Sequence, residues 1–347
     1  MSEITIYDIA KEAGVSPATV SRVLTNNTPV SDKKRQVIEN VIKKYNFTPN
    51  AAARNLGGGT RVIGLMVADI RNPYYASMAV ECEKAANERG YTVLLCNMFL
   101  DQALEDNHLD KLYAQRVEAI IQIGRRTDYV LSDPVYAEHV KIISRVIPFI
   151  TTGKLDGVDY YSVRINDAQS MKMVMDYLIF LGHTEIALIG GIKQVRSTFD
   201  KQNQYLEILK THKLKFRKEF IQEGNYDYEA GYKLMTSLLK GKVRPGAVIA
   251  INDECAIGAI FAAQDHGLSV PNDISVIGFD NSLNSTMVRP LLTTVDCDYP
   301  LYGRTLVDTA IHAAQKKKPP REILLDSRLI VRESCASAGS LSGNNKE

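Results

Sequence analysis

Apolar residues near the N-terminus recur every three or four positions, which is the spacing of one helix face. Thr5 and Asp8 form a capping signature before the first run, so a short helix is expected to begin after Thr5 and to end at Gly14. Ser16 and Pro17 suit the cap and the first position of a second helix. Two short helices joined by a tight glycine turn predict a helix-turn-helix.

The apolar pattern continues into a third helix, which Ser31 is expected to cap. Its apolar face is expected to carry Val37, Ile38, Val41, Ile42 and Tyr45. Together the three helices predict a small all-α head over residues 1–49.

From Arg61 onward, apolar runs of strand length alternate with helical periods. The expected strands are 62–68, 91–96, 119–123, 186–189, 247–251, 274–279, 292–296 and 322–325, and the expected helices include 74–89, 104–113, 170–181 and 302–314. This order predicts an α/β fold with doubly wound parallel sheets. Because the rhythm starts afresh at Ser162, we expect two lobes, the first formed by 61–161 with 297–325 and the second by 162–296 with 326–336. The polar tail 337–347 is expected to be disordered.

Composition narrows the class of protein. The 347 residues are 45% hydrophobic and 24% charged, as in a globular protein with real cores. No leader or membrane-length apolar run is present, so a cytoplasmic protein without membrane contact is expected. Five scattered cysteines without a Cys-x-x-Cys pair favour reduced thiols. Through Arg61 the chain has nine Lys or Arg against five Asp or Glu, or +4, so the remainder of the +2 chain carries −2.

A basic helix-turn-helix head is typical of DNA recognition. In this motif the start of the second helix lies over the base edges in the major groove. That part of the chain contains Pro17, Ala18 and Arg22, with hydroxyls at Ser16, Thr19 and Ser21. Arginine can donate two hydrogen bonds to a guanine, and hydroxyls suit phosphate oxygens.

Three motifs in the first 56 residues carry a family resemblance. They are Tyr-Asp-Ile-Ala at 7–10, Ala-Thr-Val-Ser-Arg-Val-Leu at 18–24, and Pro-Asn-x-x-Ala-Arg-x-Leu at 49–56. With these motifs the chain resembles the LacI/GalR family of bacterial transcription regulators over residues 3 to about 334. The resemblance implies a periplasmic-binding-protein-like body, a homodimer on a palindromic operator, and further DNA contacts from Thr5, Tyr7, Thr25, Ser31 and Asn50.

The segment 50–60 is expected to be a hinge helix followed by a glycine linker. Asn50 to Leu56 is too short for a helix that is stable alone, and Gly57-Gly58-Gly59 ends it. In the family such a helix forms against its twin in the minor groove. The resemblance therefore assigns Ala53 and Leu56 to minor-groove insertion.

The loops after parallel strands are where a small molecule binds to an open α/β sheet. Carboxylates, amides and tyrosines in those loops suit the hydroxyls and apolar faces of a sugar. The expected effector-binding residues are Asn72, Tyr74, Tyr75, Arg125, Asn166, Asp167, Arg196, Lys201, Asn252, Asp253 and Asp280. Asn252, Asp253 and Asp280 also match effector positions of the family, and each Asn or Asp is equally suited to capping a helix.

Three departures from the family leave the effector's identity open, and one of them is that Asn166-Asp167 reverses the commoner Asp-Asn order. Lys201 stands where the family often has an arginine four residues before an aromatic, here Tyr205, and Cys297 stands where several sugar-binding members have glutamine. A lysine cannot clamp a ligand in a bidentate way, so a phosphate-bearing effector is one option. Arg196 lies nearby as a replacement clamp.

Three functions are compared. The first is a repressor of a carbohydrate-utilisation operon, switched by a sugar or sugar-phosphate effector. The second is a catabolite-control type of regulator, in which a phosphorylated carrier protein docks on the first lobe as corepressor. Lys201 and the segment 287–290 are compatible with it. The third is an enzyme, which is disfavoured because no nucleophile triad, phosphate loop or metal spacing appears. No cofactor is expected, and without an apolar heptad tail the assembly expected is a dimer.

Overall fold

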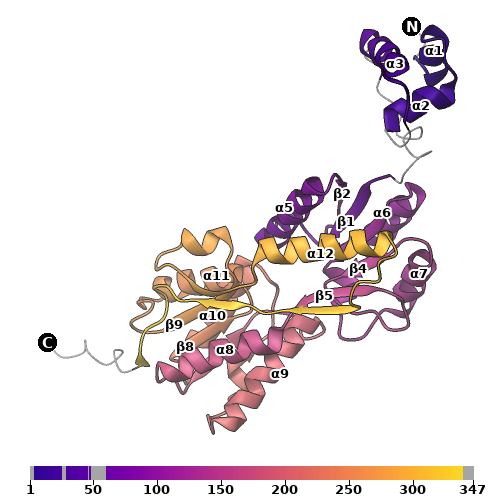
Figure 1. Cartoon of the computed structure of the whole chain (residues 1–347). Helices are drawn as coiled ribbons and strands as arrows, with labels where there is room; N and C mark the ends of the chain where they lie inside the picture. The colour runs from indigo at the N-terminus through magenta and orange to yellow at the C-terminus, as the bar shows by residue number, and fades with distance from the viewer. Residues whose placement is uncertain (1–3, 26–28, 46, 48–59, 339–347) are drawn as a thin grey trace.

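The computed structural model describes residues 4–25, 29–45, 47 and 60–338. They form a three-helix head and an α/β body with two six-stranded sheets (Figure 1). The expected fold class is confirmed. Along the described ranges, no helix is both long and apolar enough to cross a membrane.

The head consists of α1 (Ile6–Glu12), α2 (Pro17–Thr25) and α3 (Asp32–Lys44). Thr5 starts α1 through a reciprocal capping box, in which its hydroxyl donates to the Asp8 carboxylate at 2.6 Å and accepts from the Asp8 backbone N–H. Gly14 follows α1 with φ of +64°, the left-handed conformation that lets the chain turn sharply. The predicted helix-turn-helix is therefore confirmed.

The three helices of the head share one small core. It is built from Ile9, Ala10, Val20, Val23, Ile38 and Val41. The expected apolar face of α3 was too wide, because Val37 and Tyr45 are 43% and 38% exposed and are not part of this core. The expected side-chain cap is also wrong, since Ser31 is the N-cap residue of α3 but its hydroxyl makes no capping hydrogen bond.

The first lobe has the strand order β11-β5-β4-β3-β1-β2, all in parallel pairs. Its strands are β1 (Val62–Val67), β2 (Thr92–Asn97), β3 (Ala119–Ile123), β4 (Phe149–Thr151), β5 (Tyr161–Ile165) and β11 (Glu322–Leu325). The helices α5 (Pro73–Glu88) and α12 (Tyr299–Ala314) pack on one face, and α6 (Gln102–Ala114) and α7 (Pro134–Ser144) pack on the other.

The second lobe repeats this plan with the order β12-β10-β9-β8-β6-β7. Its strands are β6 (Ile186–Ile189), β7 (Ile221–Gln222), β8 (Ala247–Ala250), β9 (Ser275–Asp280), β10 (Thr293–Asp296) and β12 (Arg328–Ile330), the last being antiparallel to β10. Helices α8 (Asp167–Phe180) and α9 (Arg196–Thr211) cover one face, and α10 (Tyr228–Leu239) and α11 (Asp253–Asp265) cover the other.

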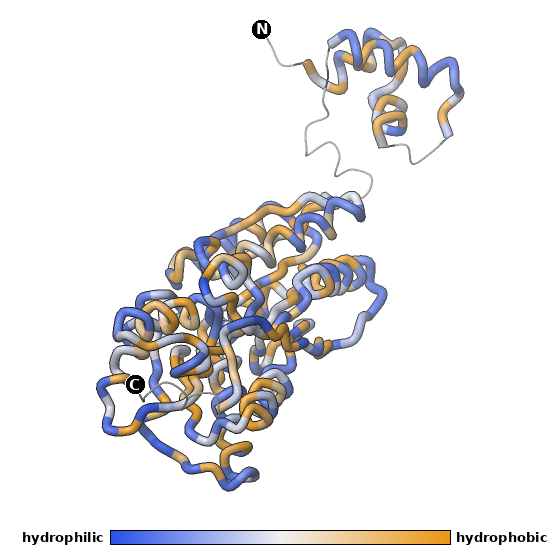
Figure 2. The backbone as a smooth tube through the Cα atoms, turned by 90° about the vertical axis from the view of Figure 1, so that its left-hand side faces the viewer, coloured by the Kyte–Doolittle hydropathy of each residue, from blue (hydrophilic) through white to orange (hydrophobic). Residues whose placement is uncertain are grey.

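Short 3₁₀ turns connect some of these elements. They are η1 (Arg125–Asp128), η2 (Lys218–Phe220) and η3 (Leu283–Thr286). In Figure 2 the helices alternate between apolar and polar stretches, and the strands β1, β3, β6 and β8 are buried along nearly their whole length. That pattern matches sheets that are covered on both faces.

The structure corrects the predicted boundary between the lobes. The sequence rhythm places Ser162 in the second lobe, but β5 pairs with β4 and β11 in the first sheet. The first crossing therefore follows Ile165. The strand pattern misled because β5 is followed by a helix like every other strand, and only its pairing partners identify its sheet.

Two glycines set how closely α10 and α11 pack. A Cβ at Gly231 would lie 2.1 Å from the Cys255 carbonyl oxygen, and one at Gly258 would lie 2.1 Å from the Tyr228 carbonyl oxygen. Both clashes are with backbone, which cannot move aside without separating the helices.

We predict that Gly258→Ala lowers the free energy of unfolding by roughly 1–3 kcal/mol, because the added methyl overpacks the contact between α10 and α11. In an open helix the same change would be stabilising. The exposed α10 substitution Ser237→Ala is the control and is expected to change stability by less than about 0.5 kcal/mol. Urea unfolding measures both, and an unchanged midpoint for Gly258→Ala would show that the helices separate freely.

Candidate functional site

The outer face of α2 is shaped for contact with another molecule. Pro17 begins the helix, and the Ser16 hydroxyl accepts from the Thr19 backbone N–H at 3.3 Å. Ala18 and Arg22 are one turn apart and both are exposed, whereas Val20 and Val23 face the core. An exposed arginine one turn from a small residue presents a donor fork beside a shallow surface, as base reading in a major groove requires.

The other predicted DNA contacts are spread around this face. Tyr7 on α1 has a 70% exposed side chain, while the hydroxyl of Thr5 is already bonded to Asp8. Hydrogen bonds from Thr5 lower the pKa of the Asp8 carboxyl. Ser21 lies half-buried, Ser31 is exposed and Thr25 ends α2. The predicted contacts Asn50, Ala53 and Leu56 lie outside the described residues.

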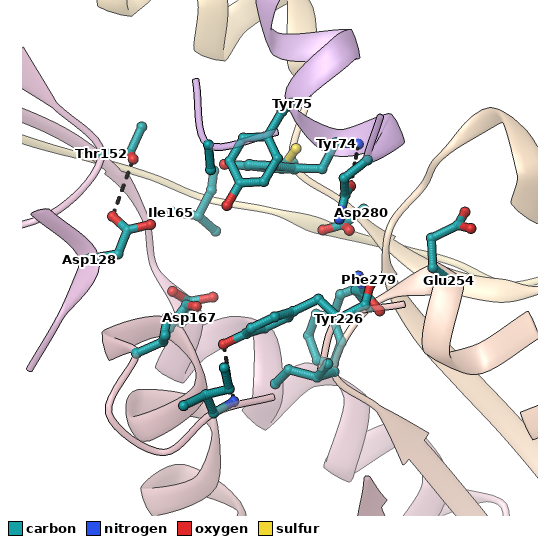
Figure 3. A pocket seen from close by; sticks show the side chains of 18 of the residues that line it. Tyr74, Tyr75, Asp128, Thr152, Ile165, Asp167, Tyr226, Glu254, Phe279 and Asp280 are labelled. Carbon is teal, nitrogen blue, oxygen red and sulfur yellow. Dashed lines mark hydrogen bonds between the residues drawn. The ribbon is translucent and has the colours of Figure 1, made fainter. Parts of the chain in front are cut away.

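A cavity of about 760 Å³ lies between the two lobes, at the carboxyl ends of their strands (Figure 3). Tyr75 of the first lobe and Tyr226 of the second approach it from opposite sides. Nine of the eleven predicted effector residues line it: Asn72, Tyr74, Tyr75, Arg125, Asp167, Arg196, Lys201, Asn252 and Asp280. The cavity has the volume and mixed apolar and polar wall of a small-molecule site.

The two predicted residues that do not line the cavity are Asn166 and Asp253. Asn166 caps α8 by accepting from the Gln169 backbone N–H. Asp253 is buried, and its carboxylate accepts from the Ser282 backbone N–H at 2.7 Å and from the Thr294 hydroxyl at 2.5 Å. Both carboxylate oxygens of Asp253 are thereby used to hold the turn after β9, which explains its position away from the wall.

Asp280 at the end of β9 presents its carboxylate to the cavity from a strained backbone. Its φ of +106° lies in a region that residues with a side chain rarely adopt, at a cost of about 1–3 kcal/mol. The next residue, Asn281, is anchored by a hydrogen bond from Arg332 at 2.5 Å. Burial, followed by the charge of Asp253, raises the pKa of Asp280 well above its ordinary range. Strain and burial together indicate a functional position.

Lys201 is not a free clamp. Its ammonium lies 2.8 Å from the Asp167 carboxylate and 4.6 Å from the centre of the Phe279 ring. Burial lowers the pKa of Lys201, but Asp167 outweighs this effect, so the pKa lies above its ordinary value. The lysine therefore stays charged and already has its counter-ion.

Arg125 approaches the cavity from the loop after β3, in front of a buried ionic network. Its Nε lies 3.6 Å from the carboxylate of Glu105, which is fully buried. Glu105 also accepts from Arg126 Nε at 3.0 Å and from Gln122 at 2.7 Å. Burial raises the pKa of Glu105 even though both arginines act against it. Arg125 is thus balanced from behind by Glu105.

Arg196 bridges the lobes at one edge of the cavity. Its guanidinium donates to the Val130 carbonyl at 2.8 Å, and the Val130 N–H donates to the Gln194 carbonyl at 2.8 Å. Tyr129 and Val195 form an isolated antiparallel bridge beside these bonds. We call residues 129–130 and 194–196 the latch. The latch connects the two lobes directly in this structure.

Several wall residues were missed by sequence analysis. Asp128 follows Arg125 in η1, and its closest hydrogen-bond partner is the Thr152 hydroxyl at 3.5 Å. Tyr226 precedes α10, and its carbonyl accepts from the Asn252 side chain at 2.9 Å. The position of Asp128 after a strand was a usable signal, because the same loop supplied Arg125. Tyr226 was hidden because α10 was not predicted.

Comparison with known proteins identifies both parts of the chain. Residues 5–50 match the family of bacterial regulatory proteins of the lacI type, and residues 175–335 match a periplasmic binding protein-like domain. Catabolite control protein A of Priestia megaterium is 35% identical over 296 residues, covering 84% of this chain and 87% of the relative. The HTH-type transcriptional repressor PurR of Proteus mirabilis (strain HI4320) is 32% identical, covering 96% and 97%.

A solved structure agrees with most of the chain. The lac repressor dimer bound to operator and the anti-inducer ONPF superposes with a TM-score of 0.85 at 25% identity, covering 96% of this chain and all of that one. This chain joins an exposed arginine on a helix-turn-helix and a cavity between two lobes in one molecule. The chain belongs to the lacI family of bacterial regulatory proteins, which are DNA-binding transcription regulators and not enzymes.

Proposed function

We propose that this protein is a homodimeric repressor whose affinity for a palindromic operator is set by a small hydroxylated effector bound between its lobes. The observation that carries the proposal is the 760 Å³ cavity, whose wall combines the strained Asp280 with tyrosines from both lobes. Carboxylates accept hydrogen bonds from hydroxyl groups, and tyrosine rings pack on the apolar faces of sugar rings. A carbohydrate suits this combination, and a carbohydrate-utilisation operon is the corresponding target.

The charges of the cavity argue against the phosphate-bearing effector that Lys201 left open. Lys201 is paired with Asp167, and the Arg196 guanidinium bonds the Val130 carbonyl. A phosphate would compete with these contacts for the two cations, and it would face the Asp280 carboxyl group. A neutral or cationic effector meets no such cost.

A surface of the second lobe supports the proposal of a homodimer. Tyr228 and Phe261 are in edge-on contact, with ring centres 5.8 Å apart, and are 36% and 42% exposed. Leu283 in η3, which packs against α11, and Met287 directly after η3 are 69% and 63% exposed. Aromatic and methionine side chains gathered on one face are typical of protein interfaces, and a second copy of the chain is the partner we infer.

Neither Lys201 nor the segment 287–290 supports the catabolite-control alternative. Lys201 is only 8% exposed inside the cavity, where a docking protein cannot reach it. The segment 287–290 follows η3 in the second lobe, whereas the carrier was expected on the first. The 35% identity to catabolite control protein A is matched by a similar identity to PurR. We therefore favour the small-molecule effector.

The first test concerns base reading by α2. We predict that Arg22→Ala costs roughly 1–3 kcal/mol of discrimination at one guanine in each operator half-site, because Arg22 is the exposed long donor on that face. Binding to random DNA should fall much less. Titrations with operator and with scrambled DNA at one salt concentration measure both. Equal losses on the two DNAs would show that Arg22 contacts phosphate only. Lys33→Ala on exposed α3 is the charge-matched control.

The second test concerns the effector cavity. We predict that Asp280→Asn raises the effector concentration needed to change operator affinity by about 2- to 12-fold, because the hydrogen bond lost at this carboxyl group contributes about 0.5–1.5 kcal/mol. A thermal-shift screen of sugars first supplies the effector. Operator binding without effector and a melting curve are measured alongside, to separate loss of ligand from loss of fold. An unchanged response would place the effector elsewhere.

A further inference from the structure

The wall of the cavity carries an unbalanced charge. Seven carboxylates line it against five cationic side chains. Free cations could still bind an anionic ligand despite this imbalance. The preference of the cavity for a cation or an anion therefore depends on whether each cationic side chain already has a partner.

The cations of the first lobe are each held by a carboxylate. The Arg71 guanidinium chelates Asp69, with the shortest contact at 2.6 Å. Arg164 is paired with Glu322, and Arg125 has Glu105 behind it at 3.6 Å. Neither Glu105 nor Glu322 lines the cavity, so these two cations are neutralised from outside it.

The cations of the second lobe are also engaged. Lys201 is paired with Asp167 at 2.8 Å, and Arg196 bonds the Val130 carbonyl in the latch. Asp200 lies close enough to Arg196 for the arginine to lower its pKa, although burial raises that pKa overall. Among the described wall residues, every cation therefore has a counter-charge or an acceptor.

Apart from the exposed Glu229, two carboxylates at the wall lack a close charged or hydrogen-bonded partner among the described residues. Asp128 has only the 3.5 Å contact with the Thr152 hydroxyl, and Asp280 accepts no hydrogen bond from any described residue. Figure 3 shows Asp128 of the first lobe facing Asp167 of the second across the space, with Asp280 farther along the wall. When all three carboxyl groups are ionised, they and Lys201 together carry a formal charge of −2, from −3 and +1.

The cavity already holds one ammonium group, that of Lys201. The Lys201 ammonium lies between a carboxylate and the face of the Phe279 ring, where both the charge and the ring quadrupole favour a cation. Asp128 offers a second carboxylate within the same cavity, and Tyr75 and Tyr226 add aromatic faces. One ammonium is supplied by the chain, and the space for another is open.

We propose that the effector is an amine-bearing hydroxylated ring, such as an amino sugar, whose protonated amino group binds Asp128 in the space that this carboxylate shares with Asp167. The inference rests on the proposed function, because it specifies the ligand of the same cavity. Asp128 is then the residue that selects for charge, and an ammonium between the lobes would attract both walls at once.

The affinity for such a ligand should depend on pH with a definite sign. Burial, and next the facing charge of Asp167, raises the pKa of Asp128 to about 7. Glu105 on α6 acts in the same direction, while Arg164 on β5 and the Thr152 hydroxyl act against it. The Asp128 carboxylate is mostly neutral at pH 6 and mostly ionised at pH 8. Binding of an alkylammonium should therefore strengthen about tenfold over that interval.

Three probes that differ only at C6 test the inference: 6-amino-6-deoxyglucose, glucose and glucose 6-phosphate. Isothermal titration of the full-length protein should give the tightest binding for the amine and the weakest for the phosphate. The preference for the amine over glucose should grow about tenfold from pH 6 to pH 8. A preference for the phosphate, or no binding of the amine, overturns the inference.

Matched variants locate the effect. Asp128→Asn should reduce the preference for the amine about tenfold and remove its pH dependence. Lys201→Gln should increase the preference, because it leaves Asp167 without its cation. Asp159→Asn, an exposed position of the first lobe paired with Arg321, should change nothing. Melting curves verify that each variant is folded, and an unchanged preference in folded Asp128→Asn refutes the assignment.

The outcome is separable from that of the proposed function. If glucose or another neutral sugar changes operator affinity while the amine has no advantage, the effector cavity stands and the amine inference fails. If the amine binds most tightly and the phosphate most weakly, but no compound changes operator affinity, the inference of an amine ligand is supported and the proposed control of DNA binding is refuted.

Discussion

The constraint on which the body depends is the direction of its parallel strands. In a parallel sheet all the carboxyl ends lie at one edge, and a chain that crosses between two such sheets places those edges face to face. Within residues 60–338 the chain crosses after β5, after β10 and after β11. Loops from both sheets consequently meet in one cavity, and Arg125, Asp167 and Asp280 reach it although they lie far apart in the sequence.

The composition of the cavity follows from this arrangement. Each loop leads into a helix or a turn, so it is rich in Asp and Asn. Some of these side chains cap the following helix, and others face the ligand. Asn252 uses both ends of its amide for the Cys255 N–H and the Tyr226 carbonyl. Asp253 holds the turn that carries Asp280 into the cavity. Some Asp and Asn side chains of these loops, such as Asp253, thus hold the loops in place, and others, such as Asp280, face the ligand. The first group keeps the strained Asp280 in position.

Whether an interaction joins residues close together or far apart in the sequence explains how much of the structure the sequence could predict. Periodicity located the head helices and the alternation of strands and helices, because both depend on local spacing. Capping located Thr5, since its partner Asp8 is three residues away. The partners of Asp253, at Ser282 and Thr294, are distant in sequence, so its role as a support could not be read. The same holds for β5, whose sheet depends on β11, and for the pairing of Lys201 with Asp167.

Opposing interactions act between the two lobes. The latch contributes two described hydrogen bonds at Val130, each contributing about 0.5–1.5 kcal/mol net. Against it, closure brings the Asp128 and Asp167 carboxylates toward each other in a partly dry cavity, as the raised pKa of Asp128 reflects. A balance of a few kcal/mol is within what a ligand contacting both walls can shift. The first lobe is connected to the head through the start of β1 at Val62. A rotation of that lobe therefore moves the end of the chain segment that leads to the head.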